Sequence, residues 1–246
     1  MVKQVIVKIA TDAAFRSNYW AFSSQQIKTA ATRALAIFCD TFPGVELTLL
    51  PQVDLWESKD FPLMRDFPMS LLLDLPRYSS FERAVEALAE KAQQLGFREE
   101  SEIRAREALD IVISNNRGKT KHSRFWYLMG FLDSAFAEEM LYDLKECRPS
   151  DGTQIVLGFT GKLFVIERDL GGCLGVAFRG GNHAVLPIQY KQRLSPVILH
   201  EVGHLFGAVH PEGEDVVSIM NNEYLEKTTR FDPENIELIH QRIKGL

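Results

Sequence analysis

The sequence predicts an α/β fold built on a mixed, mostly parallel sheet. Apolar residues over 4–9 and 45–50 indicate two strands, and the apolar period over 23–42 indicates a helix between them. Pro43 and Gly44 end this helix. A strand, a helix and a strand in this order favour a parallel pair with a right-handed crossover.

The C-terminal half continues the alternation of strands and helices. Strands are expected at residues 154–159, 162–167, 173–178 and 184–188. A helix should begin near Ser195, which can cap it, with Pro196 at its first position. A closing helix is expected at 232–243, with Asp232 as the N-cap.

The middle of the chain is predicted to be mainly helical, and we expect a single domain over 1–246 with a helical insertion at about 51–150. Four prolines predict irregular structure over 51–75. The elements expected after it are helices at 79–95, 98–109 and 134–147 and a strand at 110–114. The aromatic residues 125–127 fit either a packed core or a substrate surface.

The amino-acid composition indicates a globular protein and argues against two kinds of partner. The 246 residues are 46% hydrophobic and 25% charged, which is typical of a globular protein with a sizeable core. The net charge of -5 and the lack of a strongly basic region argue against a nucleic-acid partner. No apolar run of about 20 residues exists, so a membrane partner is not expected.

Lys3, Gln4 and Lys8 interrupt the apolar core that a signal peptide would need at the N-terminus. We therefore expect a cytoplasmic protein, or a secreted one whose leader was already removed. The odd number of cysteines, Cys39, Cys147 and Cys173, argues against a disulfide scaffold. Free thiols are the simpler interpretation, with one disulfide and one free thiol as the alternative.

Residues 200–210 read HEVGHLFGAVH and carry the strongest functional signal. Residues four apart on a helix share a face, so His200 and His204 can bind one metal ion. Gly207 allows the chain to turn sharply after the helix, which would return His210 to the same ion. A catalytic zinc ion takes three protein ligands and keeps one position for water.

Glu201 is rotated about 100° from His200 around the helix, which places it at the rim of the ligand face. From there its carboxylate can accept a proton from zinc-bound water. A structural zinc site is the alternative, but such sites close the fourth position with cysteine or histidine. No such residue follows nearby in the sequence.

The extended motif HExxHxxGxxH resembles that of the metzincin clan of zinc endopeptidases, and Met220 resembles the methionine of the clan's Met-turn. Without the upstream motif, Met220 would be interpreted as a core residue. The resemblance implies a zincin-like domain with a twisted sheet, an antiparallel edge strand, an active-site helix, the Met-turn and a C-terminal helix. It also implies one catalytic Zn²⁺.

The chain matches no single named family within the clan. Adamalysins carry aspartate after the third histidine, matrix metalloproteinases usually serine and archaemetzincins cysteine, whereas this chain has Pro211. Astacins and serralysins carry a tyrosine two residues after the methionine, where this chain has Asn222.

The segment 174–184 resembles the edge-strand region over the metzincin cleft. A peptide can add to such an edge through main-chain hydrogen bonds. The tentative substrate-binding residues are Leu174, Gly175, Val176 and Ala177. An ordinary buried strand is the alternative interpretation.

These observations predict a zinc-dependent metalloendopeptidase, a hydrolase in which zinc activates water and Glu201 is the general base. Its partner would be a peptide or protein substrate. Two other functions remain open: a non-proteolytic zinc amidase or other hydrolase, and an inactive peptidase fold that serves as a binding module.

Overall fold

The computed structural model describes residues 2–18, 24–59, 81–94, 96–101, 103, 106, 124–161, 175–188, 194–213, 215–221, 224–225 and 227–246. The chain divides into two compact units. We call Met1–Ser58, Asp143–Leu163 and Leu174–Leu246 the sheet unit, and Lys59–Tyr142 and Phe164–Cys173 the helical unit. The predicted strands at 110–114 and 162–167 lie outside the described residues.

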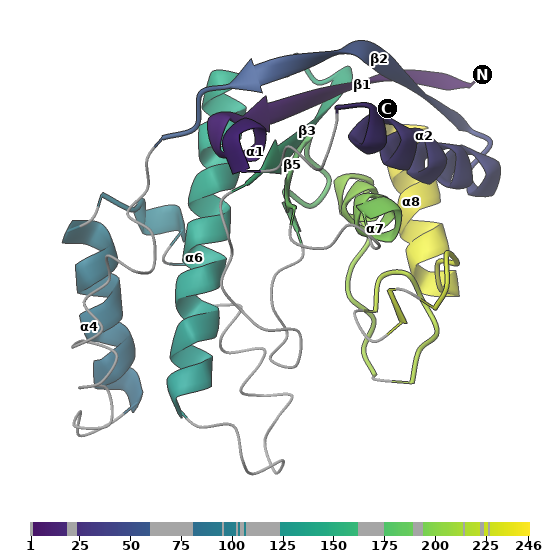
Figure 1. Cartoon of the computed structure of the whole chain (residues 1–246). Coiled ribbons are helices and arrows are strands. Elements are labelled where there is room, and N and C mark those ends of the chain that lie inside the picture. The colour runs from purple at the N-terminus through teal and green to yellow at the C-terminus, as the bar shows by residue number, and fades with distance from the viewer. Residues whose placement is uncertain are drawn as a thin grey trace. The chain divides into compact units, whose positions relative to one another are not determined.

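The sheet unit contains a five-stranded sheet with the order β2-β1-β3-β5-β4 (Figure 1). Its strands are β1 (Lys3–Asp12), β2 (Val45–Trp56), β3 (Gln154–Thr160), β4 (Val176–Ala177) and β5 (His183–Pro187). Four strands are parallel, and β4 pairs antiparallel with β5 at one edge. The mixed, mostly parallel sheet is as predicted.

Strand β2 is longer than predicted, and residues 51–56 are strand rather than irregular. Val7 pairs with Leu49 and Ile9 with Val53, so three residues of β2 lie opposite one residue of β1. Pro51 falls inside this bulge, where the missing N–H costs no ladder bond. A proline at an edge strand therefore marked a bulge and not the end of the strand.

One face of the sheet packs against helices α2 (Ser24–Thr41) and α7 (Leu194–Leu205), and α8 (Pro233–Gly245) contributes to the same apolar core (Figure 1). The period predicted for α2 is confirmed, because Ile27, Ala31 and Ala34 are buried. Four aromatic rings cluster between the helices: Phe38, Phe42, Phe206 and Phe231. This apolar cluster holds α7 in place against the core.

At the carboxyl ends of β1 and β3, Asp12 holds neighbouring segments together. Its carboxylate accepts hydrogen bonds from the backbone of Phe15, in the short helix α1 (Ala13–Asn18), and from the backbone of Gly161. It also accepts the hydroxyl of Thr160. Because Asp12 is fully buried, these bonds offset the cost of removing its carboxylate from water.

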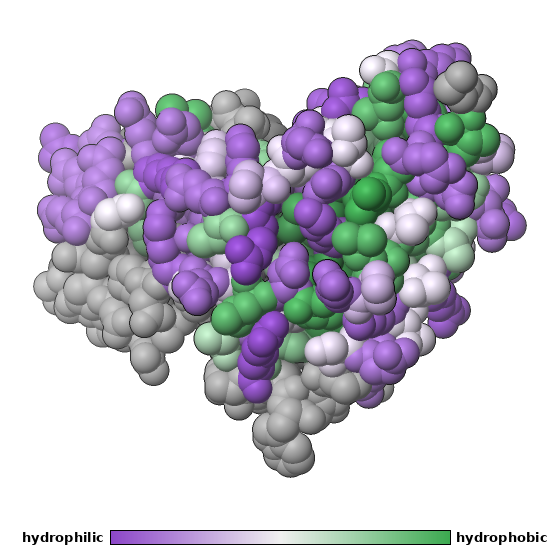
Figure 2. Space-filling view, turned by 90° about the horizontal axis from the view of Figure 1, so that it is seen from above, coloured by the Kyte–Doolittle hydropathy of each residue, from purple (hydrophilic) through white to green (hydrophobic). Residues whose placement is uncertain are grey.

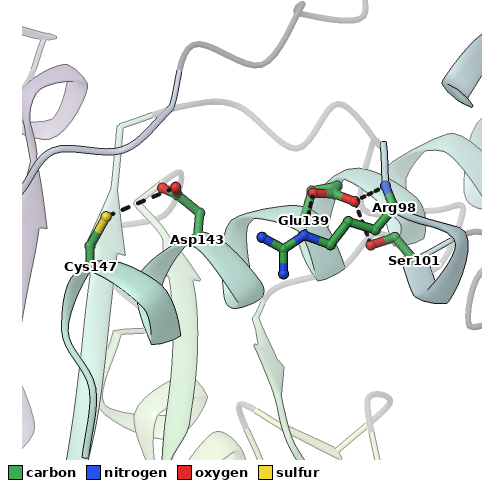
Figure 3. Close-up of polar contacts among 5 residues, drawn as sticks. All are labelled: Arg98, Ser101, Glu139, Asp143 and Cys147. Atoms are coloured by element: carbon green, nitrogen blue, oxygen red, sulfur yellow. Dashed lines mark hydrogen bonds and ion pairs between the residues drawn. The ribbon is translucent and has the colours of Figure 1, made fainter. Parts of the chain in front are cut away.

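The last turn of α6 (Arg124–Cys147) belongs to the sheet unit. Asp143 accepts the indole N–H of Trp56 at 2.9 Å, and the thiol of Cys147 lies 4.0 Å from the same carboxylate (Figure 3). Cys39 and Cys147 are free thiols, whereas Cys173 lies outside the described residues.

The helical unit contains α4 (Phe81–Gln94) and most of α6. Helix α6 begins at Arg124, ten residues before the predicted start, and the side chains of 125–127 lie outside the described residues. The buried carboxylate of Glu139 accepts the backbone N–H of Arg98 and, at 2.8 Å, the hydroxyl of Ser101 (Figure 3). These bonds join α6 to the segment after α4.

The face of β1 and β2 opposite α2 is exposed along the amino-terminal half of these strands, at Ile6 and Thr48, whereas Asp12 and Trp56 at their carboxyl ends are buried. It mixes hydrophilic residues with a band of hydrophobic ones (Figure 2). Ile6 is 37% exposed there. Among the described residues, no helix is long and apolar enough to span a bilayer.

Candidate metal centre

Helix α7 carries His200, Glu201 and His204 within two turns. It packs on the core through Ile198, Val202 and Leu205, which are fully or almost fully buried, as the helical period predicts. The helix already includes Leu194, so Ser195 lies inside it and does not cap it. The cap prediction failed because Ser195-Pro196 also fits the second and third positions of a first turn.

The chain turns sharply after α7. Gly207 has a φ of 94° and donates its N–H to the carbonyl of His204 at 2.9 Å. The next N–H, of Ala208, bonds to the carbonyl of Gly203 at 3.0 Å. This pair of bonds is a Schellman motif, which needs a left-handed residue where glycine stands. The turn brings His210 back toward the helix.

The three imidazoles converge on one point. The Nε2 atoms of His200 and His204 are 3.0 Å apart, and each lies 3.2 Å from the Nε2 of His210. In a tetrahedral zinc site with Zn–N bonds of about 2.0–2.1 Å, ligand nitrogens lie about 3.3 Å apart. The spacing therefore matches three ligands of one ion. Among the described residues, these histidines form a cluster that could hold a metal.

Backbone carbonyls fix the orientation of two of these rings. The Nδ1 of His200 lies 2.8 Å from the carbonyl oxygen of Ile219, and the Nδ1 of His204 lies 2.9 Å from that of Ala208. A carbonyl only accepts, so each Nδ1 must carry the proton. The lone pair of each ring is then on Nε2, facing the other rings, which is the tautomer that a metal ligand needs.

The environment keeps the three histidines neutral. Burial, together with the neighbouring His204 and His210, holds the pKa of His200 well below its usual value. Burial and His210 lower the pKa of His204 to about 4. Burial of its ring also lowers the pKa of His210. Neutral imidazoles are ready to bind a cation near neutral pH.

The residues fit a divalent cation for a second reason. Two neutral rings whose Nδ1 atoms are protonated present lone pairs to each other at 3.0 Å, and lone pairs repel. A cation at their common point converts this repulsion into coordination. Nitrogen ligands in this number are typical of zinc.

Glu201 lies next to the cluster in α7 and is only 3% exposed. Among the described residues, its Oε2 has no hydrogen-bond partner. Burial raises the pKa of this carboxyl to about 8. A side chain with a raised pKa and an unpaired oxygen beside a ligand cluster has the properties of a proton-transfer group.

The edge-strand segment contacts Glu201 through Gly175. A Cβ atom at position 175 would lie 2.7 Å from the carboxyl carbon of Glu201, so only glycine leaves this carboxylate its space. The two residues of β4, Val176 and Ala177, are half-buried at the end of the sheet. The predicted strand 173–178 is thus two residues long where described, and Leu174 lies outside the described residues.

The loop after β4 is fastened to the helices behind the cluster. The N–H of Gly180 bonds to the carbonyl of His204 at 2.9 Å, and Arg179 donates to the carbonyl of Gly207 at 3.1 Å. Arg242 of α8 donates to the carbonyl of Gly180 at 2.7 Å. These bonds fix the position of the edge strand relative to α7.

Met220 is fully buried beneath α7. Its sulfur would lie 2.7 Å from a Cβ atom at position 203, so Gly203 lets it approach the helix between the two histidines. Ile219 directly before it supplies the carbonyl for His200. The turn that carries Met220 therefore contacts both the helix and His200.

Sequence reasoning missed three polar residues that support the site: Ser218, Asp232 and Asn235. Of these, only Asp232 was predicted, and only as the N-cap of the closing helix. Burial would raise the pKa of Asp232, but hydrogen bonds from Ser218 and Asn235 hold it below its usual value. His183 lies apart from the cluster: it is buried in β5, and its Nε2 lies 2.8 Å from the carbonyl oxygen of Arg148.

A groove of about 610 Å³ lies elsewhere, between α2 and β2. Its described lining is mainly apolar, with Lys28, Glu46 and Cys39 as the reactive or charged groups. None of the three clustered histidines lines it. The groove therefore offers no ligand set comparable to that of α7.

No protein-family model matches the chain, and no curated protein matches it. Among solved structures, a similar one is the crystal structure of archaemetzincin from Methanopyrus kandleri, with a TM-score of 0.49 and 14% sequence identity, covering 99% of this chain and 96% of that chain. Another, described as the structure of a chaperone-substrate complex, has a TM-score of 0.46 and 9% identity, covering 99% of this chain and 34% of that chain. The chemistry of the histidine cluster therefore rests on side-chain geometry.

Proposed function

We propose that this chain is a zinc-dependent metallopeptidase that hydrolyses internal peptide bonds. One observation carries the proposal. Three Nε2 atoms lie within 3.0–3.2 Å of one another, beside a buried carboxyl group with an unpaired oxygen. His200, His204 and His210 would hold the ion, and Glu201 would be the catalytic residue.

When bound, the zinc ion supplies Lewis acidity, which polarises a peptide carbonyl and lowers the pKa of coordinated water. Glu201 accepts the proton of the attacking water and passes it to the leaving amine. Its burial in an apolar setting strengthens this exchange, since a desolvated carboxylate is a better base than a hydrated one. A nearby dication would favour the carboxylate form at neutral pH.

The substrate would add as an extended strand to β4, which is the last strand of the described sheet. Val176 and Ala177, with Gly175 directly before them, would form the substrate-binding edge, and an edge strand binds peptides without demanding a particular sequence. Contact between Gly175 and Glu201 supports this assignment, because it places the general base beside the edge. Met220 would support the ligand helix from below.

The test is cleavage of a proteome-derived peptide mixture, followed by mass spectrometry. The wild-type protein should cut internal bonds, and a zinc chelator should stop it. Glu201→Gln keeps the shape of the side chain but removes the base, so it should bind zinc and lose about 10²–10⁴-fold in rate. Glu212→Gln, which changes an exposed carboxylate close by in the sequence, is the matched control and should cleave normally.

Each outcome separates the candidate functions. Internal cleavage that survives in Glu201→Gln would overturn the mechanism. Hydrolysis of small amides without cleavage of long peptides would identify a zinc amidase instead. Tight zinc binding with no hydrolysis of any substrate would identify a binding module on a peptidase fold.

A further inference from the structure

The buried side-chain amide of Asn235, at the start of α8, is hydrogen-bonded to the backbone of Val209, the residue before His210. Asn235 is fully buried. Its Oδ1 accepts the N–H of Val209 at 2.7 Å, and its Nδ2 donates to the carbonyl of Val209 at 2.9 Å. The side chain thus pairs with a peptide unit through both its donor and its acceptor.

The orientation of this amide follows from its third partner. Nδ2 also lies 2.7 Å from an oxygen of Asp232, which as a carboxylate can only accept. The NH₂ group must therefore face Asp232 and the carbonyl of Val209. The oxygen of Asn235 is left for the N–H of Val209.

Asp232 connects Asn235 to the turn that orients His200. It caps α8 by accepting the N–H of Asn235 at 3.0 Å, and it accepts the hydroxyl of Ser218 at 2.7 Å. The oxygen of Ser218 in turn accepts the N–H of Met220 at 3.1 Å. Between them lies Ile219, whose carbonyl orients His200.

The position of His210 depends on the hydrogen bonds between Asn235 and Val209 more than the positions of the other two histidines do. His200 and His204 are held by α7 and by carbonyls at Nδ1. Among the described residues, the ring of His210 has hydrogen-bond-distance and ring contacts only with the other two imidazoles, and no carbonyl orients its Nδ1. The bonds from Asn235 to Val209 are therefore the nearest rigid support for this ligand.

We propose that Asn235 is a positioning residue for the metal centre, which it serves through a chain of hydrogen bonds with Asp232 and Ser218. This inference rests on the proposed function, in which the three histidines hold zinc. The first turn of the C-terminal helix then sets the position of His210, in the loop after α7, and the orientation of His200, on α7 itself. Residues that orient metal ligands in this way usually change metal affinity by 10–100-fold.

The test uses Asn235→Asp in the full chain. The new side chain keeps an oxygen for the N–H of Val209 but presents a second oxygen to the carbonyl of Val209 and to Asp232. Zinc affinity, measured by competition with a chromogenic chelator, should fall about 10–100-fold. The Co²⁺-loaded protein should also show altered visible absorption, since the geometry of the ligands changes.

Two further variants separate positioning from general stability. Ser218→Ala removes one link to the turn that orients His200, and it should also weaken zinc binding. Thr160→Val removes a buried hydrogen bond to Asp12 in the same unit but touches no ligand segment. It should lower the metal-free unfolding temperature and leave the zinc affinity and the Co²⁺ spectrum unchanged.

Wild-type zinc affinity and an unchanged Co²⁺ spectrum in Asn235→Asp would overturn the inference. If that variant does not fold, wild-type affinity in Ser218→Ala would overturn it equally. Equal losses of affinity in Ser218→Ala and Thr160→Val would also do so, because general destabilisation would then explain both. Failure of the wild-type protein to bind zinc would instead refute the proposed function.

Discussion

At the scale of single residues, Gly175 determines where the carboxylate of Glu201 can lie. A methyl group at position 175 would come within 2.7–2.8 Å of the side-chain carbons of Glu201, closer than carbon atoms pack. The carboxylate would have to move away from the edge strand. Because general-base catalysis depends on short proton-transfer distances, a small displacement has a large effect on rate.

Gly175→Ala should therefore lower kcat about 10²-fold or more, with zinc affinity unchanged. Steady-state kinetics on a cleaved peptide, together with chelator competition, measures both quantities. Gly180→Ala is a contrasting variant, since a Cβ there meets no atom within 4 Å, although its φ of 65° adds backbone strain. Full activity in Gly175→Ala would show that Glu201 needs no such space.

Glu201 also makes the stability of the metal-free protein depend on pH. Its folded-state pKa of about 8 lies above the ordinary value of 4.5, so the folded chain binds more protons between these pH values. The free energy of unfolding should then fall as pH rises through this window. From pH 6.5 to 8 the loss should be about 1–2 kcal/mol.

Urea unfolding of the chelated protein, repeated for Glu201→Gln, tests this prediction. The three histidines oppose the effect below pH 6.5, because their lowered pKa values make stability rise with pH there. Both proteins share that contribution, so their difference isolates Glu201. A parallel pH dependence in the two proteins would contradict the raised pKa.

At the scale of elements, the contact between α7 and the turn of Met220 is tight. A Cβ atom at position 203 would lie 2.7 Å from the sulfur of Met220 and 2.9 Å from the ring of Phe231. Gly203→Ala should therefore destabilise the protein by about 1–3 kcal/mol, despite the better helix propensity of alanine. Zinc affinity should fall as well, because Ile219 in this turn orients His200.

A double-mutant cycle with Met220→Ala checks this contact. The smaller side chain makes room for the new methyl group, so the combined loss should be less than the sum by about 0.5–3 kcal/mol. Denaturant unfolding of the four proteins gives the coupling energy. If the two losses of unfolding free energy were strictly additive, Met220 and Gly203 would not be in contact.

Local signals predicted those elements whose ends are fixed by local chemistry. Helix α8 begins where Asp232 accepts the N–H of Asn235, and α2 ends just before Pro43. The prediction failed where pairing with another segment overrides a local signal. Pro51 would end an isolated strand, but the bulge against β1 lets β2 continue to Trp56.

At the scale of the whole molecule, the proposed metal binding would join segments that are distant in sequence. The three clustered histidines and the residues that support them come from α7, the loop after it, the turn at 218–221 and the start of α8. An ion that binds only the folded arrangement adds to its stability. At free zinc 100-fold above the dissociation constant, the gain should be about 2.7 kcal/mol.

Thermal unfolding with zinc and with chelator measures this gain. His204→Ala should lose it, whereas His240→Gln, which changes a histidine next to Phe42 and outside the cluster, should keep it. A zinc-dependent rise of equal size in His204→Ala would place the ion somewhere else.

The clustering of the three histidines could be predicted from the sequence because its spacing is local, with HExxH on one helix and Gly207 at the turn. The supports were not, because Asn235 and Val209 are brought together by tertiary packing alone. Nor does a pattern show that Gly175 lies against Glu201. The prediction of one catalytic domain with an insertion stays a prediction, since the chain divides into a sheet unit and a helical unit.

The most direct test of the central claim is a crystal structure of the zinc-loaded protein with anomalous diffraction data at the zinc edge. We expect one strong anomalous peak about 2.0–2.1 Å from the Nε2 atoms of His200, His204 and His210. A peak elsewhere, or coordination that leaves out His210, would contradict the account.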